Sequence, residues 1–123
     1  MKVSFDFDGA LSKKNVQEYC SKLIRNGHEV WIVTSRTKEF NGAIHYHDDL
    51  MLVAKELGIS EDRIHFTNAE DKAPFLFLNK FDIHLDDDLH ELIQIFETSV
   101  TGMNVRNNLW RTYIDQFLGE KND

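Results

Sequence analysis

Four groups of polar residues in this chain each come after a short stretch of strand-forming residues. They are Asp6 with Asp8, Thr34 with Ser35, Lys72, and the acidic run Asp86, Asp87 and Asp88. The carboxyl ends of parallel strands meet at one edge of a sheet, and ligands bind at that edge. We therefore expect these side chains to converge on one site.

Asp6 and Asp8 are two carboxylates only two residues apart. They share a face if the strand continues, and a turn at Gly9 would splay them. A hard divalent cation held by oxygen ligands would remove their repulsion, and Asp87 from the neighbouring strand end could complete the site. Mg²⁺ fits better than Zn²⁺, because the chain has no Cys/His set with zinc spacing.

Thr34 and Ser35 offer hydroxyl and backbone donors, and Lys72 offers a mobile positive charge, so together they suit a phosphoryl group. The reaction would begin with attack of the Asp6 carboxylate on phosphorus, giving an aspartyl-phosphate. Asp8 would protonate the leaving oxygen and then activate water, while Mg²⁺ and Lys72 offset the developing charge.

Each group also has an ordinary structural explanation. Asp-x-Asp at a strand end is common in turns, Thr-Ser often caps a helix, a single Lys is usually solvated, and an Asp triplet suits a helix amino end. The placement of all four groups after successive strands is what favours a site.

Strand-like and helical segments alternate along the chain. The strand-like segments are 2–7, 28–33, 63–66, 81–85 and a fifth near 98–105. Between them apolar residues recur at helical spacing, with Gly27 and Gly58 closing two helices and Asp71 placed to cap a third. The last two helices are marked by Leu89, Leu92, Ile93 and Phe96, and by Leu109, Trp110, Tyr113, Ile114, Phe117 and Leu118. This order predicts an α/β fold with a parallel sheet of about five strands and helices on both faces.

The length of 123 residues fits one domain, which we place at 1–119, followed by a polar tail at 120–123. The longest apolar runs are too short to span a bilayer, and the first residues lack a signal-peptide pattern. Cys20, the only cysteine, lies on an apolar helical face and is expected to be buried. These features predict a soluble cytoplasmic protein.

Four segments carry the polar groups: Phe5-Asp6-Phe7-Asp8-Gly9-Ala10-Leu11, Ile32-Val33-Thr34-Ser35-Arg36, Asp71-Lys72-Ala73-Pro74 and Ile83-His84-Leu85-Asp86-Asp87. In this order they resemble the four motifs of haloacid-dehalogenase-superfamily phosphatases. The first is close to the family pattern Asp-x-Asp-Gly-Thr-Leu, with Ala10 in place of Thr. The resemblance implies a Rossmann-like core and hydrolysis of phosphomonoesters through an aspartyl-phosphate.

The resemblance also implies the metal ligands. Asp6 would give a carboxylate and Asp8 its backbone carbonyl to Mg²⁺. Asp87 is favoured as the direct ligand of the acidic pair, with Asp86 supporting it, and Asp88 has no motif role.

By the same resemblance Thr34 binds phosphate, and Lys72 is favoured over Lys80 as the motif lysine because it opens a helix. Members of this superfamily often carry a cap domain that selects the substrate. Neither 12–27 nor 37–71 has room for one, so the chain resembles the capless subtype. An open site suits a phosphorylated macromolecule, or a small phosphate if a partner chain or the 37–46 loop covers it.

The 37–46 loop is equally compatible with substrate contact and with a plain surface loop; its notable residues are Phe40, Asn41, Gly42, His45 and Tyr46. For His45 and His47 a solvated loop is favoured over a metal role. The net charge of −7 argues against general duplex-DNA binding. Oligomer formation is left open.

Two other functions compete with hydrolysis. One is a catalytically silent module that binds phosphate or metal on the same fold. The other is a receiver-type signalling domain, which we rank low because the third strand ends Phe66-Thr67-Asn68 without the Asp that receivers carry there.

Overall fold

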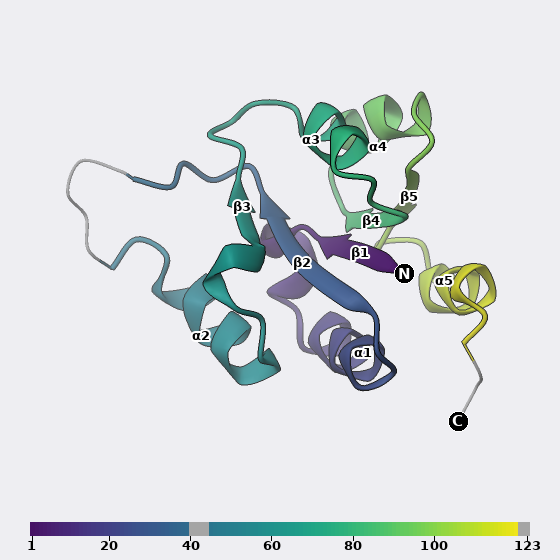
Figure 1. The fold of residues 1–123 in the computed structure, drawn as a ribbon, viewed down its shortest axis with the longest axis horizontal. Coiled ribbons are helices and arrows are strands. Elements are labelled where there is room, and N and C mark those ends of the chain that lie inside the picture. Colours follow the sequence, from purple (N-terminus) through teal and green to yellow (C-terminus); the bar gives the residue numbers. More distant parts are fainter. Residues whose placement is uncertain (40–44, 121–123) are drawn as a thin grey trace.

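The computed structural model describes residues 1–39 and 45–120, and its centre is a sheet of five parallel strands (Figure 1). The strands are β1 (Lys2–Phe5), β2 (Glu29–Thr34), β3 (Ile64–Phe66), β4 (Ile83–Asp86) and β5 (Thr101–Asn104). Their order across the sheet is β3-β2-β1-β4-β5, and every neighbouring pair is parallel. The prediction of an α/β fold with about five parallel strands is confirmed.

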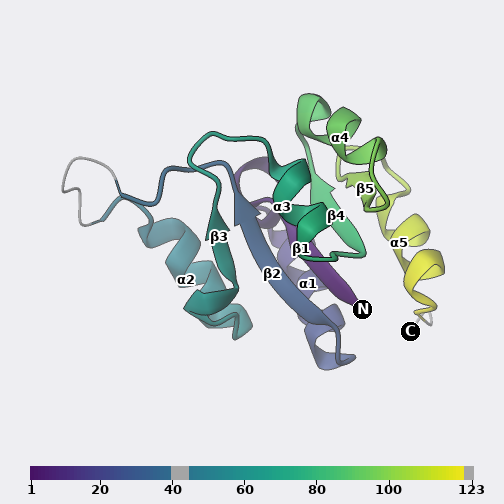
Figure 2. The same cartoon turned by 45° about the horizontal axis from the view of Figure 1, so that its top comes forward.

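In the described part of the chain, five α-helices cover the two faces of the sheet. They are α1 (Lys14–Arg25), α2 (Asp48–Leu57), α3 (Lys72–Leu78), α4 (Leu89–Phe96) and α5 (Trp110–Leu118). Helices α3 and α4 lie on one face, and α1, α2 and α5 lie on the other (Figures 1 and 2). A short helical turn, Glu61–Arg63, precedes β3.

Each face has its own apolar core. The larger core joins the sheet to α1, α2 and α5, and in it the rings of Tyr19 and Trp110 meet edge to face at 5.0 Å. The smaller core lies under α3 and α4, and its buried members are Val33, Ala73, Leu76, Phe81, Ile95 and Val100. The two cores fix α3 and α1 on opposite faces of the central strands.

The alternation of side chains along β1 and β4 decides which residues reach the α3 face. The apolar residues that pack toward α1 are Val3, Phe5, Ile83 and Leu85. The residues between and after them, Ser4, His84 and Asp86, must therefore point toward α3. Asp6 continues this pattern, since its backbone N–H still donates to the carbonyl of Leu85 at 2.8 Å.

The first strand is shorter than the sequence suggested, because β1 ends at Phe5 and Phe7–Leu11 forms a single wide turn. Gly9 sits in this turn with φ of 76°, a backbone conformation that disfavours side chains. The turn separates Asp6, which is buried, from Asp8, which is exposed. The sequence allowed the two side chains either to share a face or to be splayed by a turn at Gly9, and the structure shows them splayed.

The other four strands begin and end within three residues of the predicted segments. Cys20 is buried as predicted, and burial raises the pKa of its thiol to about 12. Glu120, placed by the sequence in the polar tail, has its carboxylate paired with His28 and with Asn26. Within the described ranges, no helix combines the length and the apolar character that crossing a membrane requires.

Helix α3 offers a matched test of the smaller core, because Leu76 is 0% exposed and Leu78 is 74% exposed. Leu76→Ala should lower the free energy of unfolding by about 2–5 kcal/mol through lost burial and a residual cavity. Leu78→Ala should change it by less than roughly 0.5 kcal/mol. Urea unfolding followed by circular dichroism measures both, and equal effects would contradict this packing.

Candidate functional site

The ammonium group of Lys72 is enclosed by carboxylates at the carboxyl edge of the sheet. Its Nζ lies 2.9 Å from Asp6 Oδ1 and 2.7 Å from Asp86 Oδ2, and the residue is 1% exposed. Lys72 is the first residue of α3, Asp6 follows β1 and Asp86 ends β4, so three elements meet here. Lys80, the other lysine considered, lies in the exposed turn before β4.

Asp86 is fully buried and uses both carboxylate oxygens. Its Oδ2 lies 2.7 Å from His84 Nε2, and its Oδ1 accepts the backbone N–H groups of Asp87 at 2.8 Å and Asp88 at 3.1 Å. His84 Nδ1 lies 2.7 Å from Ser4 Oγ. Burial lowers the pKa of His84, which favours the neutral ring; in that form Nε2–H would donate to Asp86 and Nδ1 would accept the Ser4 hydroxyl.

The pKa values of the two carboxylates that contact Lys72 are shifted in opposite directions. Burial raises the pKa of Asp6 from 3.8 to about 7, and Lys72 offsets this only in part because Asp86 and Asp87 add negative charge nearby. Burial acts on Asp86 in the same sense, but the His84 hydrogen bond and the Lys72 charge outweigh it and hold the pKa of Asp86 below its ordinary value. Burial opposes the charge on Lys72, yet the two carboxylates keep the pKa of Lys72 above its ordinary value.

Asp87 is held in place by the turn that follows β1. A Cβ at Gly9 would lie 2.1 Å from Asp87 Oδ2, so the close approach of the carboxylate requires glycine at that position. Arg106, in the loop after β5, has Nη2 at 3.4 Å from the same Asp87 oxygen. The Asp87 carboxylate is therefore fixed between two loops at the edge of the sheet.

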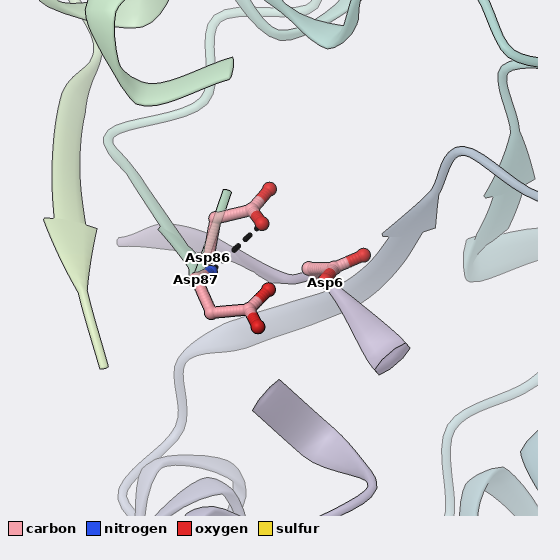
Figure 3. A group of neighbouring side chains, drawn as sticks. All are labelled: Asp6, Asp86 and Asp87. Atoms are coloured by element: carbon pink, nitrogen blue, oxygen red, sulfur yellow. Dashed lines mark hydrogen bonds between the residues drawn. The ribbon is translucent and has the colours of Figure 1, made fainter. Parts of the chain in front are cut away.

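Asp6, Asp86 and Asp87 each offer a carboxylate oxygen, and these oxygens all lie within 4.8 Å of one another (Figure 3). Figure 3 shows Asp86 and Asp87 extending to the same side of β4, with Asp6 beside them at the end of β1. A group of carboxylate oxygens is the donor set that Mg²⁺ and Ca²⁺ prefer. The residues present therefore fit a hard divalent cation.

Asp8 is not a member of this acidic group, because Arg36 engages both of its oxygens. Arg36 Nε and Nη2 donate to Asp8 at 2.9 and 2.8 Å, and Nη1 and Nη2 donate to Asp49 at 2.9 Å each. The guanidinium also lies over the ring of Phe7, 5.0 Å from its centroid. These hydrogen bonds raise the pKa of Arg36 and lower that of Asp49 to about 2, so the bridge remains charged at neutral pH.

Thr34 and Ser35 lie at the end of β2 and in the loop after it. Thr34 is buried, and its Oγ1 accepts the N–H of Arg36 at 3.2 Å. Ser35 is exposed, and its carbonyl accepts the N–H of Ala69 at 2.8 Å. Neither side chain is hydrogen-bonded to Asp6 or Lys72 in the described part of the chain, so the phosphate cradle stays a prediction.

The start of α3 is stabilised differently from the sequence expectation. Helix α3 begins after Asp71, but the Asp71 side chain accepts no capping hydrogen bond. Instead Glu91 of α4 reaches across and accepts the Lys72 N–H at 2.9 Å. Asp88, which has no motif role, caps α4 by accepting the N–H groups of His90 and Glu91.

The two loop histidines occupy different environments. His45 is exposed and lies 2.8 Å from Asp48. His47 packs on Phe66, and its Nε2 lies 2.9 Å from the carbonyl of Thr37, so it is not simply solvated. Of the other loop residues singled out from the sequence, Phe40, Asn41 and Gly42 lie outside the described residues.

Sequence reasoning gave no role to several residues that hold the site together. These are Ser4, Arg36, Asp49, His84, Glu91 and Arg106. Arg36 lies two residues after Thr34 and His84 two residues before Asp86, inside the motif-like segments. Their positions could therefore have suggested contacts with the site. Asp49, Glu91 and Arg106 reach the site only through tertiary contacts, and no local pattern marks them.

No protein-family model matches the chain, and no curated protein sequence matches it either. Among solved structures the chain is similar to an uncharacterised protein from Corynebacterium glutamicum ATCC 13032 Kitasato. The TM-score is 0.68 and the identity 14%, over 99% of this chain and 97% of that chain. This similarity shows a shared α/β fold, and a shared fold does not define an activity.

Cation binding should depend on pH through Asp6, because the cation needs the ionised carboxylate and the pKa of Asp6 is raised to about 7. Affinity for Mg²⁺ or Mn²⁺ should rise by about tenfold per pH unit below that pKa and level off above it. Isothermal titration calorimetry in buffers of different ionisation enthalpy measures the proton release. Equal affinity at acidic and neutral pH, with no proton released, would contradict this assignment.

Gly9→Ala should weaken cation binding by about 10–100-fold, because the new methyl group displaces Asp87 without removing a ligand. Gly58→Ala is the matched control, since Gly58 has a similar φ of 79° and nothing lies within 4 Å of its added Cβ. Both variants should lose about 1–2 kcal/mol of stability from the left-handed backbone. If both weaken the cation equally, the Gly9–Asp87 contact has no special part in binding.

Proposed function

We propose that this protein is a Mg²⁺-dependent phosphomonoester hydrolase that works through an aspartyl-phosphate at Asp6. The observation that carries the proposal is the Asp6 carboxylate itself, buried at a strand end with Lys72 Nζ at 2.9 Å and two further carboxylates nearby. A second carboxylate, Asp8, follows two residues later on the exposed side of the same turn. The resemblance of positions 5–87 to the four motifs of haloacid-dehalogenase phosphatases supports the same reaction.

In the first half-reaction an oxygen of Asp6 bonds to phosphorus as the phosphorus–oxygen ester bond breaks. Asp8 gives a proton to the departing oxygen, so the product leaves as an alcohol. In the second half-reaction Asp8 takes a proton from water, and the water oxygen attacks phosphorus. The bond to Asp6 then breaks, which releases inorganic phosphate and regenerates the free carboxylate.

In this proposal, charge is balanced by residues at the ends of strands and by Lys72 at the start of α3. Lys72 faces the oxygens of Asp6 and would stabilise negative charge on the transferring group. Thr34 and the backbone of the following loop would donate hydrogen bonds to phosphate oxygens. Asp6, Asp86 and Asp87 would hold Mg²⁺, which when bound neutralises part of the phosphate charge.

Arg36 affects whether Asp8 can transfer a proton, because it binds both oxygens of the Asp8 carboxylate. Its bidentate contact fixes the orientation of the Asp8 carboxylate, and Asp49 anchors the guanidinium from the opposite side. This Arg36 clamp holds Asp8 on the exposed side of the turn that follows β1. It must loosen on at least one oxygen for Asp8 to reach a leaving group.

The same clamp favours a second candidate function, a catalytically silent module that binds phosphate or metal. In the described structure both oxygens of Asp8 are engaged by Arg36, which is the arrangement expected if Asp8 performs no proton transfer. Asp6 could still bind a cation or a phosphate analogue. The two functions therefore differ in turnover and not in binding.

The substrate in this proposal is a phosphomonoester, of a small molecule or of a macromolecule, since the segments 12–27 and 37–71 carry no cap domain. We place the reaction in the cytoplasm, where the single buried thiol of Cys20 would remain reduced.

The test is release of phosphate from a generic aryl phosphate with Mg²⁺. Asp6→Asn should lower turnover by about a thousandfold or more, because the nucleophile is lost. Asp62→Asn, which changes an exposed carboxylate next to β3, should leave turnover unchanged. Fluorine NMR with beryllofluoride should detect an Asp6-dependent complex in the wild type.

The outcomes separate the two functions. Turnover lost only in the Asp6 variant supports the hydrolase. A beryllofluoride complex without turnover on any phosphoester identifies the silent module. Absence of both overturns the assignment of Asp6 as a phosphate-reactive residue.

A further inference from the structure

Helix α4 exposes a row of large apolar side chains. Leu89 and Ile93 are each 64% exposed and Phe96 is 85% exposed, whereas Glu91 and Ile95 are buried. Glu91 faces α3, where it binds the Lys72 N–H. Because successive helical residues are about 100° apart, the exposed row points away from α3 and over the outer side of β5.

Helix α5 exposes a second apolar row beside the same strand. Asp115 accepts from Tyr19 and Lys22 of α1, and the Arg111 guanidinium lies over the Tyr19 ring, so this side of α5 faces α1. The opposite side carries Leu109, Tyr113 and Phe117, which are 43–52% exposed. This row therefore also points outward, past β5.

Strand β5 lies between the two rows and ends the sheet (Figure 2). Its one hydrogen-bonded neighbour in the described sheet is β4. The strand reads Thr-Gly-Met-Asn, without a charge or a proline, although such residues commonly protect edge strands from pairing. A shallow apolar pocket of about 370 Å³ adjoins it, lined by α4 residues and by Gly102 and Asn104.

We propose that this edge surface, made of β5 with the apolar rows of α4 and α5, binds a second copy of the same chain. The six apolar side chains expose on the order of 700 Å², taking roughly 200 Å² for a fully exposed large side chain. That is close to the roughly 800 Å² per partner that a standard stable interface buries. It exceeds the apolar patches of a few hundred Å² common on monomers.

A second copy fits because an edge strand is complementary to itself about a two-fold axis. Two β5 strands pairing antiparallel would satisfy each other's backbone groups and extend the sheet across the axis. The same rotation sets α4 against α4 and α5 against α5, so each apolar row meets its own equivalent.

Charges at the rim agree with this arrangement. Glu97 follows α4 near the amino end of β5, and Arg106 follows the carboxyl end of β5. Antiparallel pairing brings the amino end of one β5 to the carboxyl end of the other. Glu97 of one copy would then lie near the exposed Arg106 side chain of the second copy, which also contacts Asp87 at 3.4 Å, and their opposite charges would favour association.

The experiment is sedimentation velocity of the full chain across a dilution series. The wild type should sediment at about twice its 14.4 kDa mass and dissociate on dilution. Phe96→Glu and Phe117→Glu, at exposed positions on different helices, should each give a monomer. Leu78→Glu, at an exposed apolar position on α3 outside the edge surface, should leave the dimer intact.

A charge exchange tests the orientation. Glu97→Arg and Arg106→Glu should each weaken the dimer, and the double variant should recover it. A wild type that stays monomeric overturns the proposal, as does a dimer that survives both Phe→Glu changes. Mass that grows steadily with concentration would indicate open-ended assembly in place of a two-fold pair and would also overturn it.

Discussion

The ion contact between Lys72 and the carboxylates of Asp6 and Asp86 is the interaction on which the rest of the structure depends. A buried ammonium is stable only when paired, and here Nζ has two anionic partners at 2.9 and 2.7 Å. With His84 neutral, the pair of carboxylates carries one negative charge more than the lysine balances. Burial raises the pKa of Asp6 and the neighbouring Asp86 charge adds to that effect, whereas the His84 hydrogen bond and the Lys72 charge lower the pKa of Asp86.

The same excess of negative charge at the site would favour binding of a cation. The folded protein holds the Asp6 proton more tightly than the unfolded chain does, so ionising Asp6 lowers folding stability as pH rises from 3.8 to about 7. Gly9 then lets Asp87 approach and add a third carboxylate to the group. A divalent cation held by these carboxylates would reverse the penalty, since it would supply the positive charge that the cluster lacks. Folding stability would then be given up locally in favour of binding, a trade common at functional sites.

The fold and the centre of the site could be predicted from the sequence because both follow from local periodicity. Strand-forming segments alternate with apolar residues at helical spacing, and parallel connection of the strands brings Asp6, Lys72 and Asp86 to one edge. The clamp on Asp8 could not be predicted in this way. It depends on how the Phe7–Leu11 turn aims Asp8 and on where α2 places Asp49, thirteen residues after Arg36. The Asp71 cap failed for a related reason, because Glu91 from α4 already binds the Lys72 N–H.

Helix α4 shows that the periodicity of apolar residues predicts a helix without deciding which side of that helix is buried. The spacing of Leu89, Ile93 and Phe96 predicts a helix, yet the buried side of that helix is set by Ile95 against β5 and by Glu91 against α3. Helices α4 and α5 both overhang the last strand, so the exposure of their two apolar rows has one geometric cause. The net charge of −7 works against association of two copies. An uncharged strip around β5, with Glu97 and Arg106 of opposite sign at its ends, is the arrangement that could overcome that repulsion.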